Sequence, residues 1–79
     1  MGKDEILKFL NDKKRGDDYR RVLEFCCEPQ AYDERRWEKM TKLSLSQMFE
    51  VIKQMKAAGG MEFMGERKWQ TTELGKSLI

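Results

Sequence analysis

Four stretches of the chain place apolar residues at the spacing of an amphipathic helix. Ile6, Leu7 and Leu10 share one stripe near the N-terminus, and Met48 and Ile52 begin another in the second half. Recurrence at intervals of three and four residues predicts a helix with one buried face. The pattern predicts helices over residues 4–15, 17–28, 34–41 and 45–58.

Residues that cap or stop helices lie at the ends of these stretches. Gly16 is expected to end the first helix, and Pro29 the second, because the residue before a proline disfavours helical backbone. Residues 30–32 form a short connection with one or two extended, pairing residues. Asp33 and Ser44 each precede a helix, where a side-chain oxygen that accepts a free backbone N–H contributes about 1 kcal/mol.

The segment after residue 58 predicts a β-hairpin. Gly59-Gly60 ends the fourth helix, with one glycine in the left-handed conformation. Two runs that contain aromatic residues, 61–64 and 67–71, surround a turn at Gly65-Glu66, with Trp69 facing the core. Thr72 then caps a short final helix over residues 73–78.

The chain of 79 residues is long enough for one domain with a thin core, because a domain of this size hides only about 60% of its unfolded surface. Apolar residues on the predicted helix faces and strands form that core. We expect in it Tyr19, Val22, Leu23, Cys26, Trp37, Met40, Leu43, Met48, Met55, Met61, Met64 and Trp69. No apolar run reaches the roughly 18 residues that cross a bilayer, and the N-terminus does not resemble a secretory signal. We therefore expect a cytoplasmic protein with no membrane partner.

Positive charge is concentrated in the second half of the chain. Residues 1–34 carry 7 basic and 9 acidic residues, and residues 35–79 carry 9 basic and 5 acidic residues, which gives the overall net charge of +2. The basic half is the one with the predicted turn, fourth helix and hairpin. A basic face on such elements favours nucleic acid as a partner.

The order of elements from residue 19 onward resembles winged helix-turn-helix transcription regulators of archaea and bacteria, of the MarR-like and single-domain repressor type. The resemblance covers about three quarters of the chain and is carried mainly by packing and turn residues. Its parts are the opening helix 20–27, Pro29, the support helix 34–40, Leu43-Ser44, the helix 46–58 with Met55 followed by Gly59, and Trp69 with Thr72-Glu73-Leu74-Gly75.

The resemblance implies a mainly α fold with a small β-hairpin, a winged helix-turn-helix with an extra N-terminal helix. Residues 1–79 would form a single domain, with residues 17–79 as the winged-helix core. Residues 1–16 lie outside the resemblance, and in such families an extra terminal helix often builds a dimer. The resemblance therefore implies a homodimer through the first helix, with the last helix as a further element of the interface. The implied function is sequence-specific binding of double-stranded DNA by a small transcriptional regulator.

The resemblance also implies which residues contact DNA. The recognition helix would present side chains to the major groove, from Ser44, Leu45, Ser46, Gln47, Phe49, Glu50 and Lys53. Cations near the tip of the wing and on the preceding helix would hold phosphates, which position a protein without reading sequence. These are Arg67, Lys68, Arg35, Arg36, Lys39 and Lys42.

Two residues of this set also fit a different partner. Phe49 is a large aromatic residue on a helix expected to face polar groups, and Glu50 is an anion beside a polyanion. Phenylalanine can contact a thymine methyl group, and glutamate can accept a hydrogen bond from the amino group of cytosine. An exposed apolar pair beside a charge is equally typical of a protein interface. A winged-helix module that binds a protein through Leu45, Phe49 and Glu50 is therefore the alternative.

Other chemistry has little support in the sequence. The chain has no histidine and no glycine-rich phosphate loop, so we expect neither an enzyme nor a cofactor, and no metal site. Carboxylate pairs such as Asp17-Asp18 lie at predicted helix starts, where capping explains them. The adjacent Cys26 and Cys27 are interpreted as a buried thiol and a partly covered thiol. A thiol or soft-metal sensor is the alternative, with two of the usual four ligands.

Overall fold

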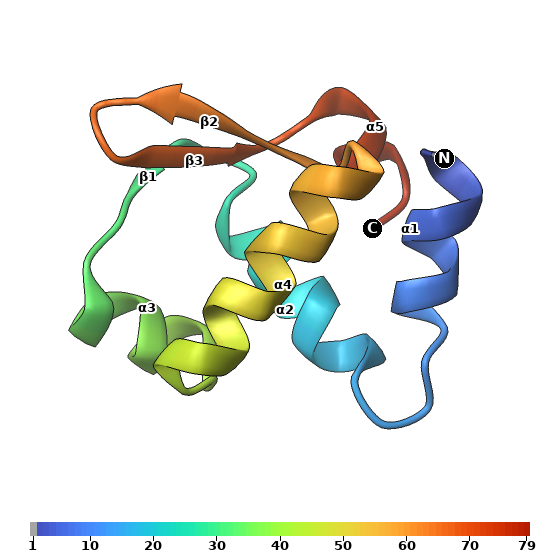
Figure 1. Cartoon of the computed structure of the whole chain (residues 1–79), viewed down its shortest axis with the longest axis horizontal. Helices are drawn as coiled ribbons and strands as arrows, with labels where there is room; N and C mark the ends of the chain where they lie inside the picture. The colour runs from blue at the N-terminus through green and yellow to red at the C-terminus, as the bar shows by residue number, and fades with distance from the viewer. Residues whose placement is uncertain (1) are drawn as a thin grey trace.

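The computed structural model describes residues 2–79 as five helices and a three-stranded antiparallel sheet (Figure 1). Along the chain the elements are α1 (Lys3–Leu10), α2 (Gly16–Phe25), β1 (Gln30–Ala31), α3 (Glu34–Thr41), α4 (Leu45–Ala58), β2 (Met61–Gly65), β3 (Lys68–Thr71) and α5 (Glu73–Ser77). The fold is a small mixed α/β domain, and its order of elements is compatible with a winged-helix layout.

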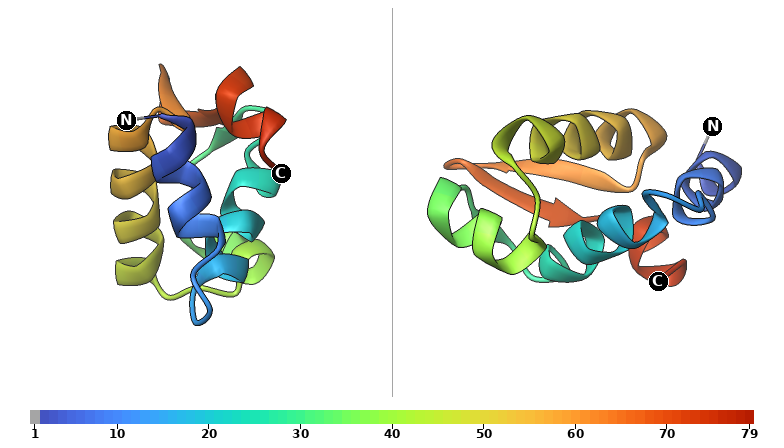
Figure 2. Two further views of the ribbon diagram at one scale, coloured as in Figure 1. Left: turned by 90° about the vertical axis from the view of Figure 1, so that its right-hand side faces the viewer. Right: turned by 90° about the horizontal axis from the view of Figure 1, so that it is seen from below.

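The helices and the hairpin lie at defined sides of the molecule. Helix α4 crosses in front of α2, and the β2–β3 hairpin runs along the top of Figure 1 with its tip at the left, above α3. Helices α1 and α5 lie at the opposite end from that tip, as Figure 1 and the right view of Figure 2 show. One end of the molecule therefore combines α3, the start of α4 and the hairpin tip.

Trp37 of α3 is the largest side chain at the centre of the core and has no exposed surface. Its ring meets Phe25 edge to face, with centroids 5.4 Å apart, and its Nε1–H donates to the Ala31 carbonyl oxygen at 3.0 Å. A buried tryptophan needs such a partner for its N–H, so this contact also fixes the chain just before α3. The other buried apolar side chains come from α1, α2, α4 and β2, and from the residues just after α2 and just before α4: Ile6, Leu10, Tyr19, Val22, Leu23, Cys26, Leu43, Met48, Val51, Ile52, Met55, Ala58 and Met61.

The predicted caps of α3 and α4 are confirmed. Asp33 Oδ1 accepts a hydrogen bond from the Arg36 backbone N–H (3.1 Å), and Ser44 and Gln47 form a reciprocal capping box at the start of α4. Gly59 ends α4 with φ 85°, in the left-handed region that glycine reaches without cost. These local interactions set both ends of α4 at the residues that the sequence predicts.

The sheet has the strand order β1-β3-β2. Met61 pairs with Thr71 and Phe63 with Trp69, and then the register shifts by one residue before Gly65 pairs with Lys68. Met64 is the extra residue of this bulge. The turn itself is Glu66-Arg67, both with positive φ, so the predicted turn at Gly65-Glu66 was wrong by one residue. Consecutive left-handed residues suit the twist of a two-residue hairpin loop.

The base of the hairpin is fixed to α2 by Thr71. Its hydroxyl donates to the Leu23 carbonyl oxygen at 2.6 Å, and its backbone N–H donates to the Cys26 carbonyl oxygen at 2.8 Å. Both groups are buried, so each bond prevents an unsatisfied polar group. These bonds also explain why α2 ends at Phe25 rather than at residue 28 as predicted, because Cys26 is already part of the contact with β3.

The N-terminal region differs from the prediction in two places. Helix α1 ends at Leu10, because the Asp12 carboxylate accepts the backbone N–H groups of Lys14 (2.8 Å) and Arg15 (2.9 Å) and forms a turn instead. Gly16 does not stop α1 but begins α2. A Cβ at Gly16 would lie 2.3 Å from the Leu10 carbonyl oxygen, so close packing and not helix termination requires glycine there.

Several apolar residues lie elsewhere than expected. Ile6 and Leu10 of α1 are buried in the domain's own core, so this apolar stripe is not available for contacts with a second chain. Met40 and Met64, expected in the core, are 52% and 49% exposed. Trp69 is half-buried and packs against the core from the sheet side.

Candidate nucleic-acid interface

Helix α4 has one exposed side that carries cations. Its buried stripe includes Met48, Ile52 and Met55, Ser46 and Lys53 are exposed on the opposite side, and Lys56 is exposed on the flank next to the sheet. No acidic residue lies in the first turn of α4. The exposed side can therefore offer hydroxyl and ammonium donors to an anionic ligand.

The first turn of α4 uses some predicted site residues for its own structure. Gln47 Oε1 accepts from both the Ser44 backbone N–H and the Ser44 hydroxyl, each at 3.0 Å. Ser46 is exposed, with its hydroxyl 3.4 Å from that of Ser44. Leu45 is half-buried and packs against the core. Ser46 is consequently the residue of this turn with the most freedom to contact a ligand.

One flank of α4 is held by the start of α2. Arg15 Nη1 donates to Glu50 Oε1 at 3.0 Å, and Tyr19 Oη donates to Gln54 Oε1 at 2.7 Å. The bond to Glu50 raises the pKa of the Arg15 guanidinium, which remains charged. Glu50, predicted to face a groove, thus has its charge balanced by Arg15 on the side away from the hairpin.

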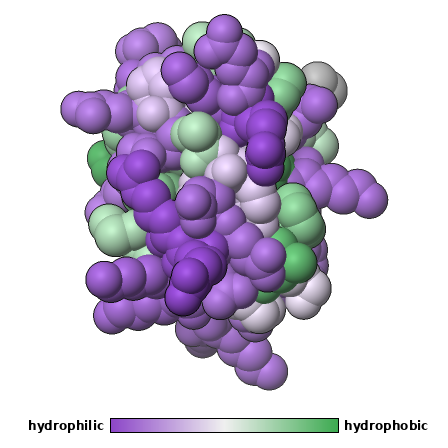
Figure 3. Space-filling view, turned by 90° about the vertical axis from the view of Figure 1, so that its left-hand side faces the viewer, coloured by the Kyte–Doolittle hydropathy of each residue, from purple (hydrophilic) through white to green (hydrophobic). Residues whose placement is uncertain are grey.

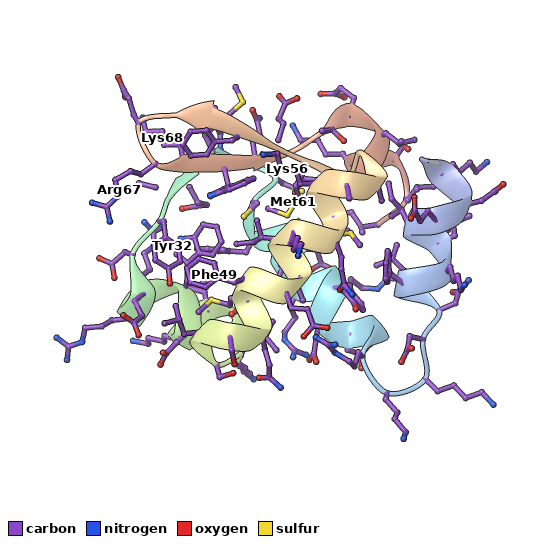
Figure 4. The ribbon with its side chains drawn as sticks, in the orientation of Figure 1. Tyr32, Phe49, Lys56, Met61, Arg67 and Lys68 are labelled. Carbon is purple, nitrogen blue, oxygen red and sulfur yellow. The ribbon has the colours of Figure 1, made fainter. Side chains whose placement is uncertain are left out.

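The other flank of α4 faces the sheet through aromatic rings. Phe49 is 52% exposed and stacks on Tyr32, with centroids 5.5 Å apart and planes 26° apart. Phe63 of β2 is 50% exposed and meets Trp69 edge to face at 5.1 Å. We call Tyr32, Phe49, Phe63 and Trp69 the aromatic cluster. Figure 4 shows Tyr32 and Phe49 between α4 and the hairpin that carries Lys68 and Arg67.

The register of the sheet places three of these four rings on one face. Phe63 pairs with Trp69, and Gln30 pairs with Trp69 from the other side, so these three residues share one face of the sheet. Tyr32, two residues after Gln30, points to the same face, and its backbone N–H donates to the Arg67 carbonyl oxygen at 2.8 Å. The sheet thus presents three aromatic residues toward α4.

Cations surround the aromatic cluster on the hairpin side. Lys56 Nζ lies 5.8 Å from the centroid of the Trp69 ring, within the range of a cation–π contact. Arg67 and Lys68 are exposed at the hairpin tip, and Lys68 Nζ lies 3.8 Å from Glu66 Oε2. An exposed ion pair of this length is worth about 0–1 kcal/mol, so Lys68 remains free to exchange it for another anion.

The start of α3 is acidic on the side next to Tyr32. Burial raises the pKa of the Tyr32 hydroxyl, and the charges of Glu34, Glu38 and Asp33 raise it further. The buried hydroxyl has no hydrogen-bond partner among residues 2–79. An anionic ligand at the aromatic cluster is consequently favoured along the hairpin and α4, and disfavoured along this edge of α3.

The predicted phosphate-binding residues of α3 are exposed but dispersed. Arg36 lies over the Phe25 ring, with its guanidinium carbon 5.7 Å from the centroid. Arg35, Lys39 and Lys42 are exposed, and Lys42 caps α3 with φ 60°. The face with α3 and the hairpin tip is largely hydrophilic, with small separate apolar areas (Figure 3). No broad apolar patch dominates this face.

Sequence reasoning missed Tyr32, Phe63 and Arg15 as parts of this region. Tyr32 lies in a connection without helical or strand periodicity, and its partner Phe49 is 17 positions further along the chain. Arg15 is 35 positions from Glu50. For Phe63, the sequence offered one indication: Met61 and Phe63 are two residues apart, so they lie on the same face of β2.

The two cysteines differ in burial. Cys26 is fully buried, and this burial raises the pKa of its thiol to about 12. Cys27 is only partly covered, and its thiol donates to the Leu23 carbonyl oxygen at 3.4 Å. Residues 2–79 contain no group of three His, Cys, Asp or Glu side chains that could hold a metal ion. The structure thus places one protected and one partly accessible thiol next to each other.

We predict that only Cys27 reacts with a thiol reagent in the native state, because Cys26 is a buried, protonated thiol. In the unfolded chain the Cys26 thiol has its usual pKa of 9.0, whereas in the folded protein its pKa is about 12. At pH values between these two, unfolding releases the Cys26 proton, so the free energy of unfolding falls as pH rises. Labelling with and without denaturant, read by mass, measures both thiols. Equal rates for the two in the native state would contradict the prediction, and a Cys27→Ser variant identifies the fast site.

Comparisons with protein-family models, with curated proteins and with solved structures return no match for this chain. Among the helices of residues 2–79, none combines the length and the apolar character that crossing a bilayer requires. The same residues enclose no pocket.

Proposed function

We propose that this chain binds duplex DNA through α4 and the β2–β3 hairpin, as a small sequence-specific regulator of transcription. One observation carries the proposal: a helix that follows a tight, capped turn has exposed cations on its outer side, and a hairpin with a basic tip lies next to it. A helix of this width fits the major groove, and a neighbouring basic hairpin can reach the adjacent phosphates.

The structure supports separate tasks for the residues of the interface. Ser46 and Lys53 lie on the exposed side of α4 and would contact base edges. Lys56, Arg67 and Lys68 would hold phosphates and position the helix without reading sequence. Arg15 supports this arrangement, because its ion pair with Glu50 reduces the repulsion between α4 and a polyanion.

One chain is the binding unit in this proposal. The apolar residues Ile6 and Leu10 of α1 are buried in the domain's own core, which leaves this stripe unable to form a homodimer. A pair of chains on a palindromic site would need contacts from another surface. The proposal therefore requires a single recognition helix for the first contact with DNA.

The test is a titration of a labelled random-sequence 20-bp duplex, followed by fluorescence anisotropy at two salt concentrations. If about four phosphates are neutralised, affinity falls about a hundredfold between about 50 mM and 200 mM salt. Binding with this slope supports the proposal and justifies selection of a preferred sequence. No binding at the lower salt concentration would contradict it.

A second candidate function is protein binding, and exposed apolar side chains favour it. Met40, Phe49, Phe63 and Met64 are each about half exposed, at 49–52%. Methionine, aromatic residues and arginine are enriched at protein interfaces. Binding to a protein through these residues would depend little on salt, which distinguishes it from phosphate contacts in the same titration format.

A further inference from the structure

We propose that the aromatic cluster binds unpaired nucleic-acid bases, so that the preferred ligand is a duplex with a single-stranded extension. The inference rests on the proposed function for the duplex part and adds a second site for the strand that leaves it. Its basis is that Phe49 lies between α4 and the hairpin (Figure 4), and that Phe49 and Phe63 of β2 are each about half exposed.

The geometry of the rings fits stacking on bases. Tyr32 covers one side of Phe49, at 26° between ring planes, and 52% of Phe49 is nevertheless exposed. Phe63 is backed by Trp69 and is 50% exposed. Rings that are held by a second ring lose little freedom when a base stacks on them, and such stacking is tolerant of base identity.

Unpaired bases suit these rings better than a duplex does. In a duplex the faces of the bases are covered by their neighbours, so a phenylalanine can reach only an edge or a sugar. An unpaired base offers a free face. Each base stacked on an aromatic side chain strengthens binding about fivefold or more.

The charges around the cluster define a path for the strand. Lys56, on the α4 side, and Arg67 and Lys68, on the hairpin, supply cations along one edge. Asp33, Glu34 and Glu38 lie on the Tyr32 side and would repel phosphate. The strand would therefore run with its phosphates toward α4 and the hairpin and its bases toward Phe49 and Phe63.

The experiment compares three labelled probes by anisotropy: a blunt 20-bp duplex, the same duplex with a ten-thymidine extension, and oligothymidine alone. The wild-type chain is expected to bind the extended duplex about tenfold more tightly than the blunt one. Phe49→Leu and Phe63→Leu, which keep an apolar side chain but remove the ring, are each expected to abolish this preference. Phe63→Leu, which lies outside the recognition helix, is expected to change blunt-duplex affinity by less than about twofold. Met64→Leu is the matched control on the same strand, outside the stacked rings.

Tryptophan fluorescence of the wild-type chain provides a measurement that needs no variant. Trp37 is fully buried, so a change on binding reports on the half-buried Trp69 beside Phe63. Quenching by the extended duplex and not by the blunt one supports the inference. Equal affinity for the two duplexes, with no quenching, overturns it while leaving the proposed function intact.

The remaining outcomes also decide between the two proposals. Loss of blunt and extended binding together in the leucine variants, with unchanged thermal melting, would show that the rings contact the duplex and would overturn the inference. Absence of binding to every probe would overturn both proposals and leave the exposed rings to a protein partner. Binding of oligothymidine without binding of the blunt duplex would support the inference and contradict the proposed function.

Discussion

Replacing Gly75 with alanine is expected to lower the free energy of unfolding by about 3 kcal/mol. A Cβ at this position of α5 would lie 2.5 Å from the Gly60 carbonyl oxygen and 2.7 Å from Thr71 Cγ2. The carbonyl belongs to backbone that also accepts the Thr72 N–H at 3.0 Å, so it cannot move away without breaking that bond. A domain of this size has a total stability of about 4–12 kcal/mol, so this loss would remove between about a quarter and three quarters of it.

Urea unfolding of the Gly75→Ala variant measures this effect, and Gly65→Ala is its matched control. Gly65 has φ 85°, but a Cβ there meets no atom within 4 Å. Gly65→Ala therefore measures the loss in free energy of unfolding from backbone strain alone, about 1 kcal/mol, whereas Gly75→Ala measures the loss from steric overlap. If Gly75→Ala is no more destabilising than Gly65→Ala, then α5 can shift away from residue 60, and the close packing of these two segments does not limit stability.

Replacing Arg67 and Lys68 together with alanine is expected to weaken duplex binding about tenfold or more at low salt. It should also lower the slope of log affinity against log salt by about 1.8, because two phosphate contacts disappear. Both side chains are exposed at the hairpin tip, so the fold should be unaffected. Arg67 already has φ 64°, and alanine has the same backbone restriction, so the strain of the turn stays the same.

The control for this variant removes the same charge elsewhere. Lys13 and Lys14 are exposed in the loop between α1 and α2, at the opposite end of the molecule from the hairpin tip (Figure 1). Their double alanine variant should change affinity by less than about threefold, since more than a Debye length separates them from the contacts. Equal losses in both variants would mean that net charge and not the hairpin determines binding.

The sequence predicted the parts of the fold that depend on neighbouring residues. The bounds of α4, the caps at Asp33, Ser44 and Thr72, and a left-handed glycine in the Gly59-Gly60 pair were confirmed, because each depends on interactions within three or four positions. Errors occurred where a distant segment decides the local conformation. Gly16 was taken for a helix stop, although the Leu10 carbonyl next to it explains the glycine.

The candidate site was less predictable than the fold for the same reason. The hydrophobic pattern identified the exposed side of α4, but not the residues that would meet its flanks. Glu50 was expected to face a ligand, and its partner Arg15 comes from the turn before α2. Phe49 was ambiguous from sequence, and its partner Tyr32 follows a strand of two residues that pairs with β3. The pairing of Gln30 and Ala31 with β3 places Tyr32 beside the sheet, and its contact with Phe49 of α4 therefore joins segments that are distant in sequence.

The attachment of the hairpin at its base also has a consequence for dynamics. Thr71 fixes β3 to α2 through two bonds, while the Glu66-Arg67 turn lies at the far end of the same strand and is exposed. Opening of the tip breaks few bonds and leaves the helices intact, whereas release of Thr71 uncovers the core. The free energy of local opening is therefore expected to rise along β3, from a low value at the turn to the value of global unfolding at Thr71. The tip can adjust to the shape of a ligand while its base retains the position of the strand.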